Sequence, residues 1–187
     1  MIDKSAGRVK RRAAAPLLAL VGALTLAAAG CGGSSSDAKA NEAYANSVCT
    51  AVSGWEQQIK TIATTFTGKP SKETLDAKVT QAEAATKTLA SDIKAIPLPD
   101  TSEAQAAKQQ LDQLSTDATA TVDAAKSAVA QIKADPSAGD ISLAVVALAP
   151  QVKNLVSEAK SAITSLKDAK GSLSKAFKNA DACKNLG

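Results

Sequence analysis

The sequence predicts an all-α protein, an antiparallel up-down-up-down four-helix bundle that occupies residues 41–187 and contains one disulfide. Three observations predict this fold. Four segments repeat apolar residues at alternating spacings of three and four, which is the period of an α-helix. Short breaks rich in Pro, Gly, Ser and Asp separate the segments. No stretch alternates apolar and polar residues as a half-buried strand would, so no sheet is expected.

The first helical segment runs from Tyr44 to Phe66, and the second runs from Leu75 to Ile96. The Gly-Lys-Pro-Ser break between them ends at Ser71, which is a suitable N-cap for the second helix. Gly54 lies beside Trp55 in the first segment, where glycine weakens a helix but permits a neighbour to approach closely. We therefore expect Trp55 to pack against an adjacent helix rather than to stack on a ligand.

The third helical segment spans residues 104–132 and the fourth spans residues 148–180. The third follows Pro97-Leu98-Pro99, with Asp100 or Thr101 as its N-cap, and residues 135–140 separate it from the fourth. Because short connections join long helices, neighbouring helices should run antiparallel. Four heptad-like seams fit a monomer or a helix-exchanging dimer, so the oligomeric state stays open.

Two of the three cysteines are expected to form a disulfide. Cys49 lies near the start of the first helix and Cys183 at the end of the fourth, and these two ends meet in an up-down-up-down bundle. Disulfides persist in exported proteins. Antiparallel pairing of the two helices around this link predicts that Trp55 contacts Phe177.

Residues 1–30 have the features of a targeting segment. Five basic residues lie within residues 1–12, and an uncharged run rich in Ala and Leu covers residues 13–29. That run is shorter than the roughly 20 strongly apolar residues that a membrane-spanning helix needs. Cleavage is therefore expected, and general secretion fits the run better than the twin-arginine route does.

The run ends Ala28-Ala29-Gly30-Cys31 and continues Gly-Gly-Ser-Ser-Ser, which resembles the lipobox and tether of bacterial lipoproteins. The family most often has Leu where this chain has Ala28. The resemblance implies that Cys31 receives a diacylglycerol and becomes the mature N-terminus. Residues 31–40 would then be a flexible tether that holds the domain on the outer face of the cell membrane. The alternative is an ordinary secretory peptide.

The mature part resembles small helical actinobacterial lipoproteins of unknown function. The resemblance is carried by Val48-Cys49 and Trp55 near the start and by Ala182-Cys183 near the end. It implies no activity.

The composition excludes most site chemistry. The chain has no His, all of its Arg lie within residues 1–12, and from Cys31 onward 17 Lys balance 17 Asp and Glu. Histidine is the commonest acid-base and metal-binding side chain, and arginine is the usual bidentate ligand for phosphate. We therefore expect no enzyme, no metal or cofactor, and no nucleic-acid partner.

The most apolar stretch of the mature chain is residues 141–149, which Pro150 follows. Beyond the disulfide the first helix would extend about 26 Å and the fourth about 50 Å, so the third and fourth helices should form a hairpin that overhangs the first pair. Because proline interrupts helices, residues 141–149 should form a separate short helix.

This segment has two interpretations, as a cap that covers the bundle or as an exposed surface that docks a partner, a second copy or an apolar ligand. The candidate binding residues are Ile141, Leu143, Val145, Val146 and Leu148. The expected function is a membrane-tethered, non-enzymatic binding module of the cell envelope, in contact with an envelope protein or an apolar ligand. The alternative is a structural envelope spacer with no specific ligand.

Overall fold

The computed structural model describes residues 35–64, 70–184 and 186. All regular structure in these residues is helical. The elements are α1 (Ser35–Thr64), α2 (Lys72–Ala95), α3 (Ser102–Ala130), α4 (Ala138–Asp168), α5 (Ser172–Asn179) and the short 3-10 helix η2 (Asp181–Cys183). The predicted all-α class and the predicted Cys49–Cys183 disulfide are confirmed, with a Cα–Cα distance of 5.1 Å. Cys31 and the targeting segment lie outside the described residues.

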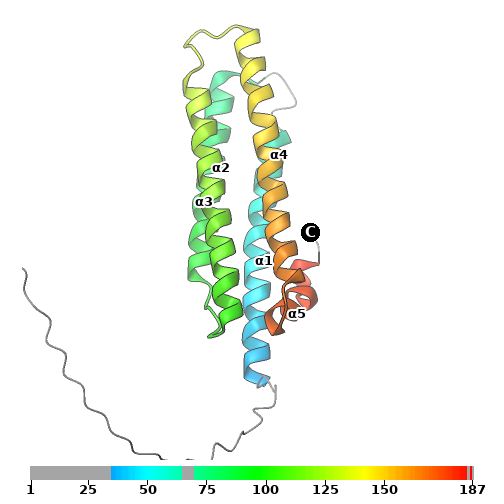
Figure 1. Cartoon of the computed structure of the whole chain (residues 1–187). Coiled ribbons are helices and arrows are strands. Elements are labelled where there is room, and N and C mark those ends of the chain that lie inside the picture. Colours follow the sequence, from blue (N-terminus) through cyan, green and yellow to red (C-terminus); the bar gives the residue numbers. More distant parts are fainter. Residues whose placement is uncertain (1–34, 65–69, 185, 187) are drawn as a thin grey trace, which may run out of the picture. The chain divides into compact units, whose positions relative to one another are not determined.

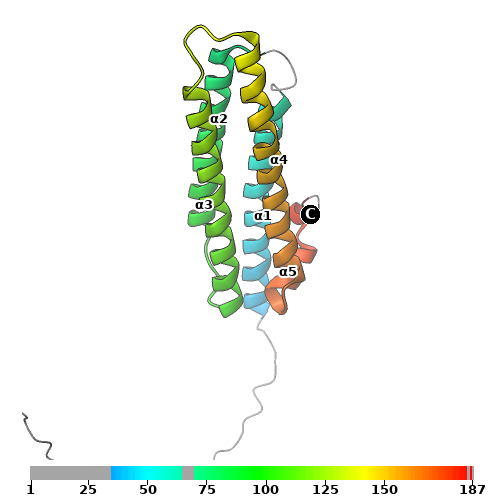
Figure 2. The ribbon, with the colours of Figure 1, turned by 45° about the horizontal axis from the view of Figure 1, so that its top comes forward.

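Residues 33–187 form one compact unit. Helix α1 packs against α2, α4 and α5, while α3 packs against α2 and α4. Figures 1 and 2 show the four long helices side by side, with α5 beside α1 and the end of α4. Helix α1 begins at Ser35, so residues 35–40, expected in the tether, are helical.

The helix starts follow their capping residues. Ser71 caps α2 by accepting a hydrogen bond from the Thr74 amide, as predicted. Of the two candidates for α3, Thr101 is the cap, and it accepts from the Ala104 amide. Helix α4 begins with a capping box in which Ser137 and Asp140 bond each other's backbone amides.

The core combines large Leu and Ile side chains with buried alanines, which allow the helices to approach closely. Ala45, Ala104, Ala118 and Ala159 are fully buried. Trp55 is also buried, and its indole nitrogen donates to Thr86 Oγ1 on α2 at 3.2 Å, so its expected packing role is confirmed.

The role expected for Gly54 is wrong. This glycine is exposed, and a Cβ atom added to it would meet nothing within 4 Å. Gly54 instead borders an open hollow between α1 and α2, and the neighbouring Trp55 makes the contact with α2.

The fourth helix does not continue to residue 180 as predicted. Helix α4 ends at Asp168, and the chain reverses through Gly171, whose φ of +106° favours glycine. Helix α5 then runs parallel to α1, since Asn41 meets Ser172, Tyr44 meets Phe177 and Cys49 meets Cys183.

The predicted contact between Trp55 and Phe177 is therefore also wrong. Phe177 lies at the level of Tyr44, with the two rings edge to face and their centroids 6.2 Å apart. This level is about 16 Å along α1 from Trp55. The cause is the reversal at Gly171, which gives α5 the opposite direction to the one assumed.

Residues 141–149 do not form a separate helix, because α4 continues through Pro150. Pro150 lacks a backbone donor, but it lies on the exposed face, where water can reach the carbonyl that loses its partner. Burial of Leu148 and Leu155 on the opposite face holds the helix together across the proline. The first turns of α4 and residues 70–73 line the same groove. The start of α4 therefore does not overhang α2, and the predicted overhanging hairpin is wrong at this point.

Candidate functional site

The candidate binding residues divide between two faces of α4. Ile141 and Leu148 are buried and Val145 is half-buried, whereas Leu143 and Val146 are 72% and 70% exposed. The cap and docking interpretations thus apply to opposite faces of the same helix. Among the described residues, Leu143 and Val146 are the large apolar side chains that are exposed.

We call Leu143 and Val146 the distal ridge. Ala147 and Pro150 are exposed on the same helical face, because spacings of three, four and seven return to one side of an α-helix. Residues 141–152 carry no charge. The ridge is therefore an uncharged apolar strip on the first half of α4.

A groove of about 630 Å³ lies on one side of the ridge, between the starts of α2 and α4. We call it the distal groove. Its apolar lining is Pro70, Pro136, Ile141, Val145 and Val146. Its charged lining includes Lys72, which is paired with Asp76 at 3.0 Å, and Glu73. Hydrogen bonds from its own backbone amide and from the Ser71 hydroxyl lower the pKa of the Glu73 carboxyl group.

A smaller hollow of about 230 Å³ lies on the other side of the ridge, between the end of α3 and α4. Leu143 and Ala144 line it together with Ile132, while Val146 borders the distal groove. Asp140 lies at its edge, where hydrogen bonds from the Ser137 hydroxyl and amide lower the pKa of the carboxyl group. The two apolar side chains of the ridge therefore border different hollows.

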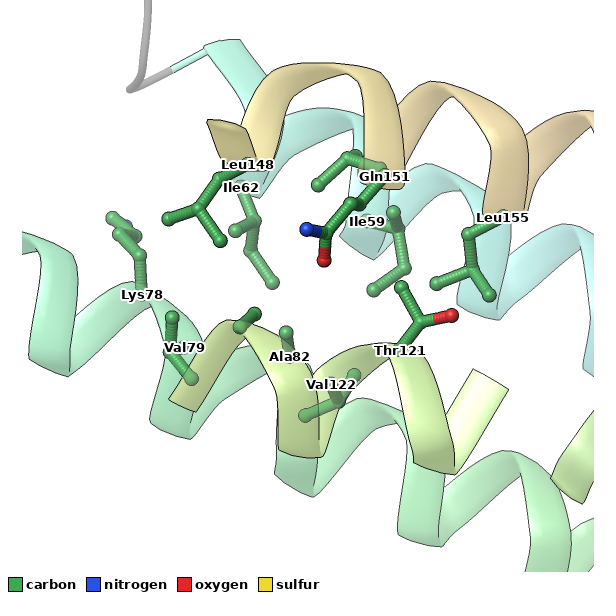
Figure 3. A pocket seen from close by; sticks show the side chains of 12 residues that line it. Ile59, Ile62, Lys78, Val79, Ala82, Thr121, Val122, Leu148, Gln151 and Leu155 are labelled. Atoms are coloured by element: carbon green, nitrogen blue, oxygen red, sulfur yellow. The ribbon is translucent and has the colours of Figure 1, made fainter. Parts of the chain in front are cut away.

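A third hollow, which we call the core cavity, lies among α1, α2, α3 and α4. Figure 3 shows its lining, with the side chain of Gln151 extending into it from α4. Its buried apolar wall consists of Ile59, Ile62, Val79, Val122, Leu148 and Leu155. Gln151 was not predicted as a cavity residue, although a polar residue between Leu148 and Leu155 in a helical repeat is a visible signal.

The residues around the disulfide form a polar network of structural character. Lys167 Nζ donates to the carbonyl oxygens of Cys183 and Leu186, at 2.8 Å for Cys183. Glu103 accepts hydrogen bonds from the Ser172 hydroxyl and the Leu173 amide, both at 3.2 Å, and so caps α5 from α3.

Tyr44 is buried beside this network. Burial and the negative charge of Asp112 raise the pKa of its phenol to about 12, so the ring stays neutral.

Within the part of the chain that the structure describes, no group of three or more His, Cys, Asp or Glu residues is placed to hold a metal ion. In the same residues, no helix has the length and apolarity needed to cross a membrane. Comparison of the chain with protein-family models, curated proteins and solved structures gave no match.

Proposed function

We propose that the protein is a membrane-tethered, non-enzymatic binding module of the cell envelope that docks a partner protein on the distal ridge. The lipobox-like sequence at Cys31 supports the tether. The observation that supports docking is the pair of exposed apolar side chains, Leu143 and Val146, on a helix that buries its other face.

Neither side chain belongs to the buried core of the domain. Full burial of a Leu or Val side chain contributes about 1.5–3 kcal/mol, which a partner covering both residues would gain before the costs of association. Polar residues at these positions would leave the buried face of α4 unchanged. The uncharged run of twelve residues, 141–152, also lowers the cost of desolvating a contact there.

The two hollows favour a protein over a small ligand as the occupant. A small molecule in the distal groove would contact Val146 and leave Leu143 exposed, because Leu143 borders the other hollow. A partner that straddles the ridge covers both side chains and inserts groups on either side.

The bundle is proposed to hold this ridge away from the membrane. We infer that the four long helices have an up-down-up-down arrangement, in which α4 starts at the end opposite the start of α1. The chain enters the domain at Ser35, and the thirty residues of α1 span about 45 Å. The ridge would then face outward, which suits a docking module better than a spacer.

Site-specific photo-crosslinking in living cells tests the proposal on the full-length chain. A crosslinking amino acid at position 143 should give one discrete species heavier than the chain. Val146→Gln should reduce its yield at least tenfold. The matched control places the crosslinker at exposed Asn154, further along the same helix, where no such species is expected.

Two outcomes would contradict the proposal. Crosslinking at position 143 that does not exceed crosslinking at position 154 would favour the structural spacer. A species at twice the mass of the chain would assign the ridge to a second copy of this protein.

A further inference from the structure

The open hollow between α1 and α2 differs from the others in charge. Its volume is about 680 Å³, and we call it the amide groove. None of the described residues that line it is charged, whereas each hollow described above has at least one charged lining residue. This stands out on a chain in which 21% of the residues are charged. The polar side chains of the groove, all exposed, are Gln57, Gln58, Thr61, Gln81 and Thr88.

Gly54 lines the same groove, where the space for a Cβ atom is empty. Glycine inside a helix weakens it, and no close packing against a neighbour compensates for this at Gly54. The missing side chain leaves the backbone of α1 open to the groove, so an occupant can approach it closely. From Gly54 to Thr61 the groove extends about 10 Å along α1, which is room for a short segment of a chain molecule.

The groove offers hydrogen-bond donors and acceptors together. Thr61 and Thr88 donate their hydroxyl protons to carbonyl oxygens of their own helices, at 2.9 and 3.0 Å, so their oxygens remain as acceptors. The side-chain amides of Gln57 and Gln58 make no hydrogen bond within the described residues. Each of these amides has two donors and one carbonyl acceptor to offer.

A neutral molecule with many hydroxyl groups matches this lining. A hydroxyl both donates and accepts, so a sugar can use the glutamine amides and the threonine oxygens at once. Ile62, Ala84 and Ala85 supply the apolar contacts that suit the C–H faces of sugar rings. An ion would lose hydration without gaining a charged partner in the groove. Lys78, the cation that contacts the lining, is already engaged with Gln81 Oε1 at 3.0 Å.

A polypeptide suits the groove less well. Bound peptides use a strand edge or apolar anchor pockets, and the residues that line this groove supply neither.

We propose that the amide groove binds a neutral glycan. Sugar hydroxyls bond to Gln57, Gln58 and the threonine oxygens, and one ring lies over Gly54. The groove is on α1 and α2 whereas the distal ridge is on α4, so the proposal does not depend on the docking function.

Uncharged hexasaccharides of glucose, mannose and galactose test the proposal, with hexagalacturonate as the charged probe of the same length. The protein is residues 31–187 with Cys31→Ser, which is the chain expected after processing but without its lipid. The backbone amide signal of Gly54 and the side-chain amide signals of Gln57 and Gln58 should shift saturably in NMR spectra with at least one uncharged hexasaccharide. Signals of exposed Gln109 on α3 should not shift. Hexagalacturonate should bind at least tenfold more weakly.

Two variants complete the test. Gly54→Leu should place a side chain in the groove and weaken binding at least tenfold. Because leucine favours a helix more than glycine does, this variant should unfold at no lower urea concentration than the unmodified protein, which separates lost binding from lost folding. Gln57→Met/Gln58→Met removes the two amides at nearly constant volume and should weaken binding by a similar factor. Ala43→Leu, at an exposed position about three turns away on α1, is the control and should bind normally.

The absence of saturable shifts with all three uncharged hexasaccharides would overturn the proposal. So would equal binding of hexagalacturonate, or binding that Gly54→Leu leaves unchanged. Saturable shifts with an uncharged Gly-Ser peptide and with no sugar would assign the groove to a polypeptide instead.

Discussion

The region around the disulfide and the region around the distal ridge are held by different interactions. Around Cys49 and Cys183, a covalent bond, the Lys167 contacts and the Glu103 cap tie α1, α3, α4 and α5 together. At the start of α4, one apolar face packs inward, the other is exposed, and hollows lie on both sides. Local opening should therefore require more free energy at the disulfide than at the ridge.

Loss of the disulfide should have the largest effect. In the double variant Cys49→Ala/Cys183→Ala, the free energy of unfolding should fall by about 4–5 kcal/mol, because the unfolded chain regains the freedom of a long closed loop. Urea unfolding followed by circular dichroism measures this change. A loss below about 1 kcal/mol would show that the polar contacts alone hold the region together.

Gly171→Ala should destabilise the protein by about 3 kcal/mol. The alanine would have a strained φ of +106°, and its Cβ would overlap Glu103 Oε1, which displaces the carboxylate that caps α5. Gly54→Ala is the matched control, since its added Cβ meets nothing. There the same urea assay should show a gain of about 0.5–1 kcal/mol, because alanine favours a helix interior. Equal effects of the two changes would contradict the role of the Gly171 turn.

Thr86→Val should cost about 1–2 kcal/mol, because the buried indole N–H of Trp55 would lose its acceptor. This contact lies between the two regions and joins α1 to α2. Thermal unfolding measures the loss, and tryptophan fluorescence reports the altered surroundings of the single indole. Thr88→Val, at an exposed position on the same helix, provides the comparison and should have a much smaller effect.

Leu143→Gln/Val146→Gln should change the free energy of unfolding by no more than about 0.5 kcal/mol, because both side chains are exposed. The same double variant should lose partner binding. A large destabilisation would mean that the ridge stabilises the domain, and would remove the argument that its apolar character serves docking.

The smallest effect on stability is expected at the surface pair that joins α2 to α3. A hydrogen bond from Lys126, with a second from Lys87, lowers the pKa of Glu83 to about 2. The stabilisation that accompanies a lowered carboxyl pKa is present above the ordinary value of 4.5 and is lost as the pH falls from there to about 2. In Lys126→Gln, NMR titration should find the Glu83 pKa closer to 4.5, and Lys87→Gln should raise it less. An unchanged value would show that the interhelical pair does not persist in solution.

Much of the helical fold could be predicted, because periodicity, breaks and caps act locally. Ser71 and Thr101 were identifiable as caps, and Cys49 could be paired with Cys183. The reversal at Gly171 was missed, since apolar spacing carried on through it from Leu166 to Leu173 and Phe177. Its Gly-Ser sequence was the available signal.

The candidate site could be predicted only in part. The apolar stretch 141–149 was evident, but which of its residues face outward depends on the direction in which α4 packs. Pro150 suggested a break in the helix. The helix continues because Leu148 and Leu155, on either side of the proline, are both buried, and the sequence alone does not show this burial. The core cavity depends on how closely four helices approach, and this distance is not encoded at any one position.

The parallel course of α5 along α1 also determines how the domain would carry a mechanical load. If Cys31 is anchored and a partner holds the distal ridge, tension enters through α1 and reaches Cys49. There the covalent route divides, and the shorter branch passes through the disulfide and α5 directly into α4. Helices α2 and α3 lie on the longer covalent branch. They therefore carry less of the tension than the shorter branch through the disulfide does.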